Sequence, residues 1–236
     1  MLNQKIKALL LMTLFLGSIS ACVEVGELSE DYHAIKLERA QVVEVRFKMS
    51  AGELSIKGGA KDLMEGYFEY NVDQWKPDIE YSVSGRKGRL TVKQTGRTGI
   101  PIGNSTNKWD INLINDVPID LRLDFGAGEG HLDMRGIDLR DLDIDMGVGE
   151  LKLDLTGKLK DDLKVNIDGG IGSATIYLSE DVGVRVKVDG GIGSVEARGM
   201  HKNDHTYIND VYGKTDITIY IEIDAGIGSI DLRLKK

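Results

Sequence analysis

One stretch of this chain decides its fold: Val165-Asn-Ile-Asp-Gly-Gly-Ile-Gly-Ser-Ala-Thr-Ile176. Its central phrase, Asp-x-Gly-x-Gly followed by Glu or Ser, occurs five times, beginning at Asp124, Asp145, Asp168, Asp189 and Asp224. Successive copies start 21, 23, 21 and 35 residues apart, and a weaker copy, Lys48-Met-Ser-Ala-Gly-Glu53, comes earlier. A nearly constant period of about twenty residues predicts stacked structural repeats.

Apolar and polar residues alternate on both sides of each phrase, which predicts strands with one buried side and one solvent-facing side. Val165 and Ile167 precede the third copy, for example, and Ala174 and Ile176 follow it. From the last inward residue before a phrase to the first one after it the step is seven, as from Ile167 to Ala174. Because inward residues of a continuous strand are an even number apart, each copy contains one extra residue.

The extra residue is expected at the second glycine of the phrase and the residue after it, since glycine tolerates the positive φ of a bulge or corner. The predicted corners are Gly128, Gly149, Gly172, Gly193 and Gly228. Hairpin turns and solenoid corners both fit this pattern. The near-equal periods favour a solenoid, in which each turn stacks on the last.

Stacking would place the aspartates of the phrases in an outward row at the strand spacing of about 4.8 Å, where like charges repel. We expect each carboxylate to accept hydrogen bonds from the glycine N–H groups of its own turn. A row of calcium ions is the alternative. Calcium-binding Gly-Gly-x-Gly-x-Asp repeats have a period of about nine residues, which this chain lacks. We therefore predict a structural role for the aspartates and no metal site.

Residues 57–115 interrupt the period and hold six of the chain's 14 aromatic residues. The sequence predicts strands over Gly66–Val72, Asp78–Val83 and Arg89–Lys93, a tight turn at Gly85-Arg-Lys-Gly88 and a loop over Thr95–Asn107. A solenoid needs a cap over its open strand edges, and we expect the aromatic residues to fill one. An aromatic surface for a glycan or a partner is the other interpretation.

The first 22 residues have the pattern of an export signal. Lys5 and Lys7 precede a short apolar run, and small residues follow it, whereas a membrane span needs about 20 apolar residues. Ile19-Ser-Ala-Cys22 resembles the lipobox of bacterial lipoproteins, which implies lipid attachment at Cys22, the only cysteine. The resemblance also implies a lipid-anchored, extracytoplasmic protein. Val23 is not the inner-membrane retention signal, so the outer membrane is favoured in a Gram-negative cell.

These features divide the chain into four parts: a lipoprotein signal peptide (1–21), a tether (22–40), an N-terminal β cap region with the first repeat (41–115) and a glycine-cornered β-repeat region (116–236). A short helix over Ser29–Ala40 is an alternative to the tether. Loss of residues 1–21 removes two lysines and no acid, so the net charge changes from −8 to −10. An acidic surface repels phosphate backbones, so no nucleic acid is expected.

The expected fold is all-β: a β-solenoid, formed as a single-stranded β-helix-like stack of glycine-cornered repeats, with an irregular β cap at its N-terminal side. The longer last interval holds His201 and His205. Two histidines four residues apart indicate a metal site only on a helix, and Gly199 and Asn203 argue against one. We expect a solvent-exposed insertion there. Nothing else has catalytic spacing, so we predict no catalytic residue, no cofactor and no enzyme.

The repeated phrase and Val43-Glu-Val-Arg-Phe-Lys-Met-Ser-Ala-Gly-Glu-Leu-Ser-Ile56 resemble the toast-rack (DUF2154-like) domains of bacterial envelope proteins. Lys108-Trp-Asp-Ile-Asn-Leu113 resembles the segment that leads into their repeats, and the resemblance extends from Val43 to Leu234. Similar patterns occur in LiaF-type C-terminal domains and in proteins assigned as adhesins. The resemblance implies an envelope-facing interaction module and supplies no catalytic residues.

Two functional hypotheses follow. The first is a membrane-anchored, non-catalytic envelope lipoprotein that binds an envelope protein, a glycan or a sister copy, in adhesion or in envelope-stress sensing. The second is a carbohydrate-active enzyme on a β-helix scaffold, which requires a groove with two or three facing carboxylates.

Overall fold

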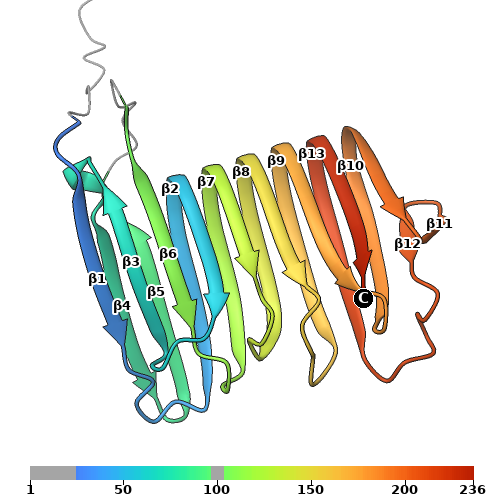
Figure 1. Ribbon diagram of the computed structural model, residues 1–236, viewed down its shortest axis with the longest axis horizontal. Helices are drawn as coiled ribbons and strands as arrows, with labels where there is room; N and C mark the ends of the chain where they lie inside the picture. Colours follow the sequence, from blue (N-terminus) through green and yellow to red (C-terminus); the bar gives the residue numbers. More distant parts are fainter. Residues whose placement is uncertain (1–24, 97–103) are drawn as a thin grey trace, which may run out of the picture.

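The computed structural model describes residues 25–96 and 104–236, whose strands form one continuous sheet. Six long strands dominate it and pair in parallel with their neighbours. They are β2 (Val42–Gly58), β7 (Ile119–Asp133), β8 (Leu139–Leu155), β9 (Leu163–Ser179), β10 (Gly183–Arg198) and β13 (Thr218–Lys235). Each folds over near its glycine phrase, so that a first arm and a second arm form two layers (Figure 1). We call these six the bent strands.

The predicted odd step is present. In β8 the inward side chain Ile144 is 3% exposed and the next fully inward one, Leu151, is 2% exposed. Gly149 lies between them with a φ of +152°, a conformation that costs L side chains free energy. The same left-handed φ occurs at Gly52, Gly128 and Gly172, whereas in β10 it falls at Gly190. The extra residue is thus absorbed at the second glycine in four of the bent strands. The other two predicted corners, Gly193 in β10 and Gly228 in β13, do not have this φ.

The glycine corners lie along a common edge, as the sequence predicts. Each second glycine pairs with the second glycine of the neighbouring bent strand, in the spatial order Gly52, Gly128, Gly149, Gly172, Gly228 and Gly193. The aspartates of the phrases pair with one another in the same order. The β-solenoid prediction is confirmed to this extent.

The stacking order differs from the sequence order at the end of the array. The last bent strand, β13, lies between β9 and β10 rather than outside β10. Asp168 therefore pairs with Asp224 instead of Asp189. The long connection after β10 makes this possible: it forms β11 (His201–Asn203) and β12 (Thr206–Ile208), which pair with each other. β12 runs antiparallel along the outer edge of β10 before the chain returns to the inner position.

The N-terminal cap contains β1 (Ser29–Ile35), β3 (Met64–Tyr70), β4 (Pro77–Ser84), β5 (Lys87–Gln94), β6 (Asn107–Leu113) and a 3₁₀ turn at Asp73–Trp75. The three strands predicted in this region are confirmed as β3, β4 and β5. The sheet divides at β2: its first arm pairs with β5, and its second arm pairs with β6, which continues to β3 and β1. Phe68, Trp75 and Trp109 are buried and fill this cap, as expected.

Residues Ser29–Ile35 correct one expectation. They form an edge strand, paired with β3 throughout, and are neither a helix nor a free tether. Tyr70 on β3 donates a hydrogen bond of 2.8 Å to the carboxylate of Asp31 on β1, which helps to fix the two strands. Polar side chains such as Asp31 and His33 occupy the inward positions of β1, so the usual alternation was not visible in its sequence. Among residues 25–96 and 104–236 there is no helix long and apolar enough to span a membrane.

Candidate binding surfaces of the bent-strand array

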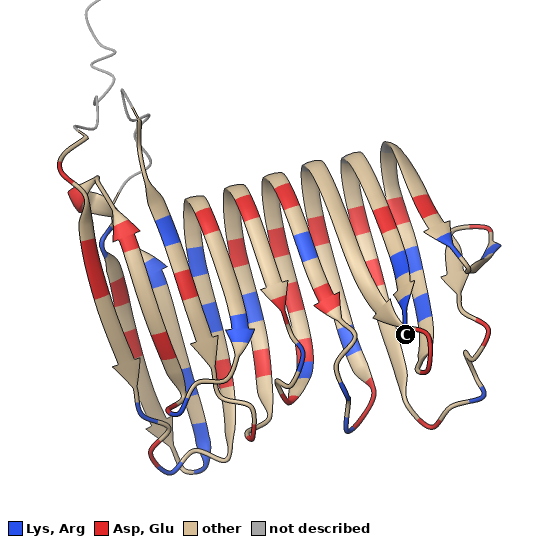
Figure 2. Ribbon diagram, in the orientation of Figure 1, with Lys and Arg blue, Asp and Glu red and all other residues tan. Residues whose placement is uncertain are grey.

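A row of acidic side chains follows the bends. Lys48 pairs with Asp124, and then Asp145, Asp168, Asp224 and Asp189 succeed one another on neighbouring bent strands. Figure 2 shows acidic residues recurring from strand to strand. The ends of this acidic row are compensated: Arg46 donates two hydrogen bonds, of 2.9 and 2.7 Å, to Asp124, and Lys187 forms an ion pair with Asp189.

The predicted turn caps do not form. Among the hydrogen bonds of the described residues, none runs from a glycine N–H to a carboxylate of the acidic row, because each aspartate side chain points outward while its bend stays in the sheet ladder. A separate carboxylate at the preceding outward position, Asp143, is paired: Arg122 lies 3.2 Å from it and Asn166 donates a hydrogen bond to it. The described part of the chain holds no cluster of three potential metal ligands.

A second surface is a polar groove on the second arms. It has a volume of about 340 Å³ and crosses β6, β2, β7, β8 and β9. Its polar lining comprises Ser55, Lys57, Asp110, Asn112, His131, Asp133, Lys152, Asp154 and Tyr177. We call this the second-arm groove. Four strand-to-strand steps of about 4.8 Å give it a length of roughly 19 Å.

Most of the charged side chains in the second-arm groove form hydrogen bonds or ion pairs with neighbouring residues. Arg135 donates hydrogen bonds to Asp133 and lowers the pKa of this carboxyl. Asp154 accepts hydrogen bonds from the backbone N–H and hydroxyl of Thr156. Tyr177 is partly covered, since the ammonium of Lys235 lies 3.5 Å from the centroid of its ring. The groove thus presents fixed acceptors and donors on a rigid sheet.

This geometry suits binding better than glycoside hydrolysis. Asp133 and Asp154 are direct neighbours on adjacent strands and do not face each other across the groove. A general acid needs a carboxyl whose pKa is raised, and that of Asp133 is lowered. Sequence reasoning missed these residues, although a signal existed: His131 and Lys152 each stand three residues after a second glycine, at equivalent outward positions.

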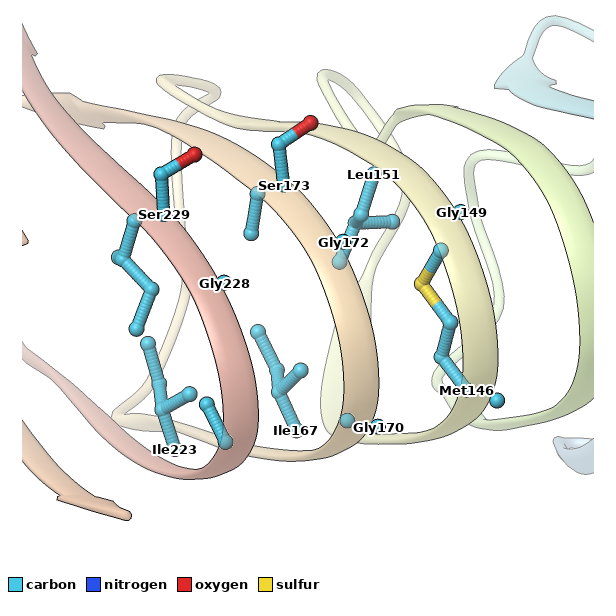
Figure 3. A pocket seen from close by; sticks show the side chains of 15 residues that line it. Met146, Gly149, Leu151, Ile167, Gly170, Gly172, Ser173, Ile223, Gly228 and Ser229 are labelled. Carbon is cyan, nitrogen blue, oxygen red and sulfur yellow. The ribbon is translucent and has the colours of Figure 1, made fainter. Parts of the chain in front are cut away.

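A third feature is an apolar hollow beneath the bends of β8, β9 and β13, with a volume of about 50 Å³ (Figure 3). It exists because one inward row loses its side chains along the array. The row reads Met49, Phe125, Met146, Gly169, Ala225 and Gly190. Ile167, Ile223 and Leu151 line the hollow, while the hydroxyls of Ser173 and Ser229 point away from it (Figure 3). It is an incompletely filled part of the core.

The two histidines of the insertion do not form a metal site. His201 lies on β11 and His205 follows Asp204, whose φ of 54° turns the β11–β12 hairpin. His201 contacts Asp210 at 2.6 Å and His205 contacts Asp204 at 3.5 Å, so each has a separate partner. Both side chains are exposed, as expected of an insertion. The insertion nevertheless contributes to the fold, because its strand β12 pairs with part of β10. Cys22 lies outside the described residues.

Comparison with known proteins identifies the family. A family model described as the N-terminal domain of toast_rack, DUF2154, matches residues 24–177. The chain belongs to the toast-rack family. A second model, for the C-terminal domain of the cell wall-active antibiotics response protein LiaF, matches residues 127–232 of this toast-rack protein. The resemblance inferred from the glycine phrases is therefore confirmed.

One solved structure is similar over almost the whole toast-rack chain. It is described as a "putative cell adhesion protein" from Clostridium sporogenes ATCC 15579, with 34% identity and a TM-score of 0.84 over 89% of this chain and 100% of that one. A "putative adhesin" from Bacteroides fragilis NCTC 9343 covers 89% and 100% at 8% identity, with a TM-score of only 0.30. No curated protein matches. The two family models and the Clostridium sporogenes structure support a non-catalytic module associated with the cell envelope.

Proposed function

We propose that this toast-rack protein is a lipid-anchored, extracytoplasmic module that binds an extended envelope glycan in the second-arm groove without cleaving it. The observation that carries the proposal is the position of the groove. It crosses strands that are paired on both sides, so their backbone groups are already used. A peptide cannot add there as a strand, and recognition must come from side chains.

The chemistry of the groove fits a hydroxyl-rich polymer. Asp110 and Asn112 can accept hydrogen bonds from hydroxyl groups, and Lys57 and Lys152 can donate them. Polar side chains follow one another at the strand spacing along the groove, as contacts to a linear polymer should. They form two rows: Asp110, Ser55, His131 and Lys152, and Asn112, Lys57, Asp133, Asp154 and Tyr177. The polar side chains of the groove are partly or fully exposed to solvent, which favours modest affinity that many copies on one surface would strengthen.

The proposal also includes a lipid anchor at the N-terminus of the mature protein. Cys22, the lipid-attachment residue in the lipobox pattern, stands seven residues before Ser29, the first residue of β1. Seven residues span at most about 25 Å, so a lipid on Cys22 would hold the cap end close to the membrane. The bent strands extend from that cap (Figure 1). Such a module would act in adhesion or in sensing envelope stress.

The glycan proposal is tested with purified envelope polysaccharides and peptidoglycan fragments. The double variant Asp110→Ala/His131→Ala should weaken binding about tenfold or more. Glu222→Ala, on the outward side of the first arm of β13, should bind like wild type. Equal binding by all three proteins, or release of sugars from any polymer, would contradict the proposal.

The anchor is tested separately by mass spectrometry of the mature N-terminus and by fractionation. The expected result is a diacylated or triacylated N-terminal Cys22 and a protein found in the membrane fraction. Cys22→Ala should move the protein to the soluble fraction and leave glycan binding intact. An unmodified Cys22 in a membrane-bound protein would show that something else holds it there.

A further inference from the structure

The outermost bent strand, β10, has an outer edge that is paired along its first arm and, among the described residues, unpaired along its second arm. Along its first arm, Arg185–Lys187 pairs with β12, and Tyr207 of β12 lies inward with 6% exposure. The chain thus closes half of the final coil by adding one short strand whose aromatic side chain covers the end of the core. Along the second arm, Ser194–Arg198 pairs with β13 on its inner side only, among the described residues.

The open arm exposes apolar side chains as well as backbone groups. Val195 and Ala197 face inward but are only partly buried, whereas their partners in β13, Ile230 and Leu232, are 6% and 0% exposed. Two hollows, of about 250 and 450 Å³, adjoin this arm. The arm therefore has the two features that strand addition requires: an unpaired edge and space for alternate side chains.

We propose that the second arm of β10 is the docking site for a β-strand of a partner protein. The added strand would cover Val195 and Ala197 with alternating apolar side chains, as Tyr207 covers the other arm. Its outward residues would meet Glu196 and Arg198, which at present pair with each other at 2.6 Å. Charge complementarity then calls for a strand with a cation beside Glu196 and an anion beside Arg198, two residues apart.

A second copy of this chain stacked end to end fits the open arm poorly. Its array has two strand edges at the other end, β4 in the layer of the first arms and β1 in the layer of the second arms, and β1, which such a stack would bring to the open arm, has Asp31 and His33 among its inward residues. Pairing β1 with β10 would bring these polar groups against Val195 and Ala197 and remove them from water, which is unfavourable without new hydrogen bonds. The proposal also differs from glycan binding, because the second-arm groove lies on the outward face of β6 to β9 and uses side chains only.

The test uses synthetic nine-residue peptides of alternating valine with charged residues at two central outward positions. One peptide carries Lys and Asp, one carries two Lys, one carries two Asp, and a fourth has a central proline that prevents strand pairing. Fluorescence anisotropy measures their affinities for wild type and for two variants, Glu196→Arg and Arg198→Glu. Both substitutions are on exposed side chains, so the fold should be retained.

Wild type should bind the mixed-charge peptide about fivefold more tightly than either like-charged peptide. Glu196→Arg should prefer the two-Asp peptide, and Arg198→Glu should prefer the two-Lys peptide. Peptide binding should slow amide hydrogen exchange at Val195–Arg198. The substitution Val195→Lys should abolish peptide binding. Equal binding of the proline peptide, or preferences that do not follow the substitutions, would overturn the proposal. So would a concentration-dependent dimer of wild type that Val195→Lys dissociates, because a second copy would then occupy the edge.

Discussion

Gly149 lies directly against Gly128 of the neighbouring bent strand: a Cβ atom added to Gly149 would overlap the backbone carbonyl oxygen of Gly128. The φ of Gly149, +152°, is also one that L side chains rarely adopt. Two independent constraints, backbone conformation and close packing of neighbouring coils, therefore require glycine at this position. The same overlap recurs at four other second glycines, each of which meets the backbone carbonyl of the bent strand beside it: Gly128, Gly172, Gly193 and Gly228.

The first prediction is that Gly149→Ala lowers the free energy of unfolding by at least about 3 kcal/mol, because the backbone must shift along a whole ladder. The matched control is Gly169→Ala in β9. Its Cβ would meet nothing within 4 Å and no left-handed φ is involved, so a gain of about 0.4–1 kcal/mol is expected. Denaturant unfolding measures both. Similar losses for the two variants would show that glycine content, rather than corner geometry, matters.

The second prediction concerns the hollow beneath the bends. Ala174 pairs with Leu151 on one side and Ile230 on the other, so it is smaller than both of its inward neighbours in the row. Ala174→Val adds two methyl groups to the hollow and should raise the free energy of unfolding by up to about 1.5 kcal/mol. A decrease in thermal midpoint would mean that the hollow is too narrow for the added atoms.

The repeated part of the fold could be predicted because each local signal agreed with the others. The odd step from Ile144 to Leu151 required one extra residue, and Gly149 was the residue able to absorb it. The same reasoning could not place β13 between β9 and β10. All bent strands carry the same phrase, so Asp224 matches the register of Asp168 as well as Asp189 does. Only the longer interval before Asp224 hinted at a different path.

The surfaces were harder to predict than the core. Inward positions are marked by apolar residues, whereas His131 and Lys152 belong to the groove only because neighbouring strands bring them together. Strand β1 was missed for a related reason, since Asp31 occupies an inward position and finds its partner, Tyr70, on a strand that lies distant in sequence. Side-chain pairs of this kind are set by tertiary structure and leave no local pattern.

The third prediction is that two members of the acidic row, Asp168 and Asp124, have opposite effects on stability. Asp168 lies between Asp145 and Asp224, so like charges flank it on both sides. Asp168→Asn should stabilise the fold by a few tenths of a kcal/mol at low ionic strength, and the gain should shrink with added salt. Asp124→Asn should instead destabilise it, because Arg46 loses a charged partner at 2.7 Å. Thermal melts at low and high salt distinguish them, and changes of the same sign would contradict the argument.

The fourth prediction is a loss of stability at alkaline pH that originates at Tyr70. Burial, together with the hydrogen bond to Asp31, raises the pKa of Tyr70 to about 12 from its ordinary value of 10.0. Below pH 10 the phenol is protonated in both the folded and the unfolded chain, so its stabilising contribution is complete. Between pH 10 and 12 the unfolded chain releases the proton first, and stability falls as the pH rises. Tyr70→Phe removes this titration and also a hydrogen bond worth about 1 kcal/mol.

Wild type should therefore have a larger free energy of unfolding than Tyr70→Phe at pH 8. The difference in this free energy should decrease steadily above pH 10. Urea unfolding at pH 8, 10, 11 and 11.5 measures it. Tyr67→Phe, on the same strand at a residue that is 59% exposed, is the matched control for the loss of a phenol hydroxyl. A Tyr70→Phe difference that stays constant with pH would mean that the phenol of Tyr70 titrates alike in the folded and unfolded chains.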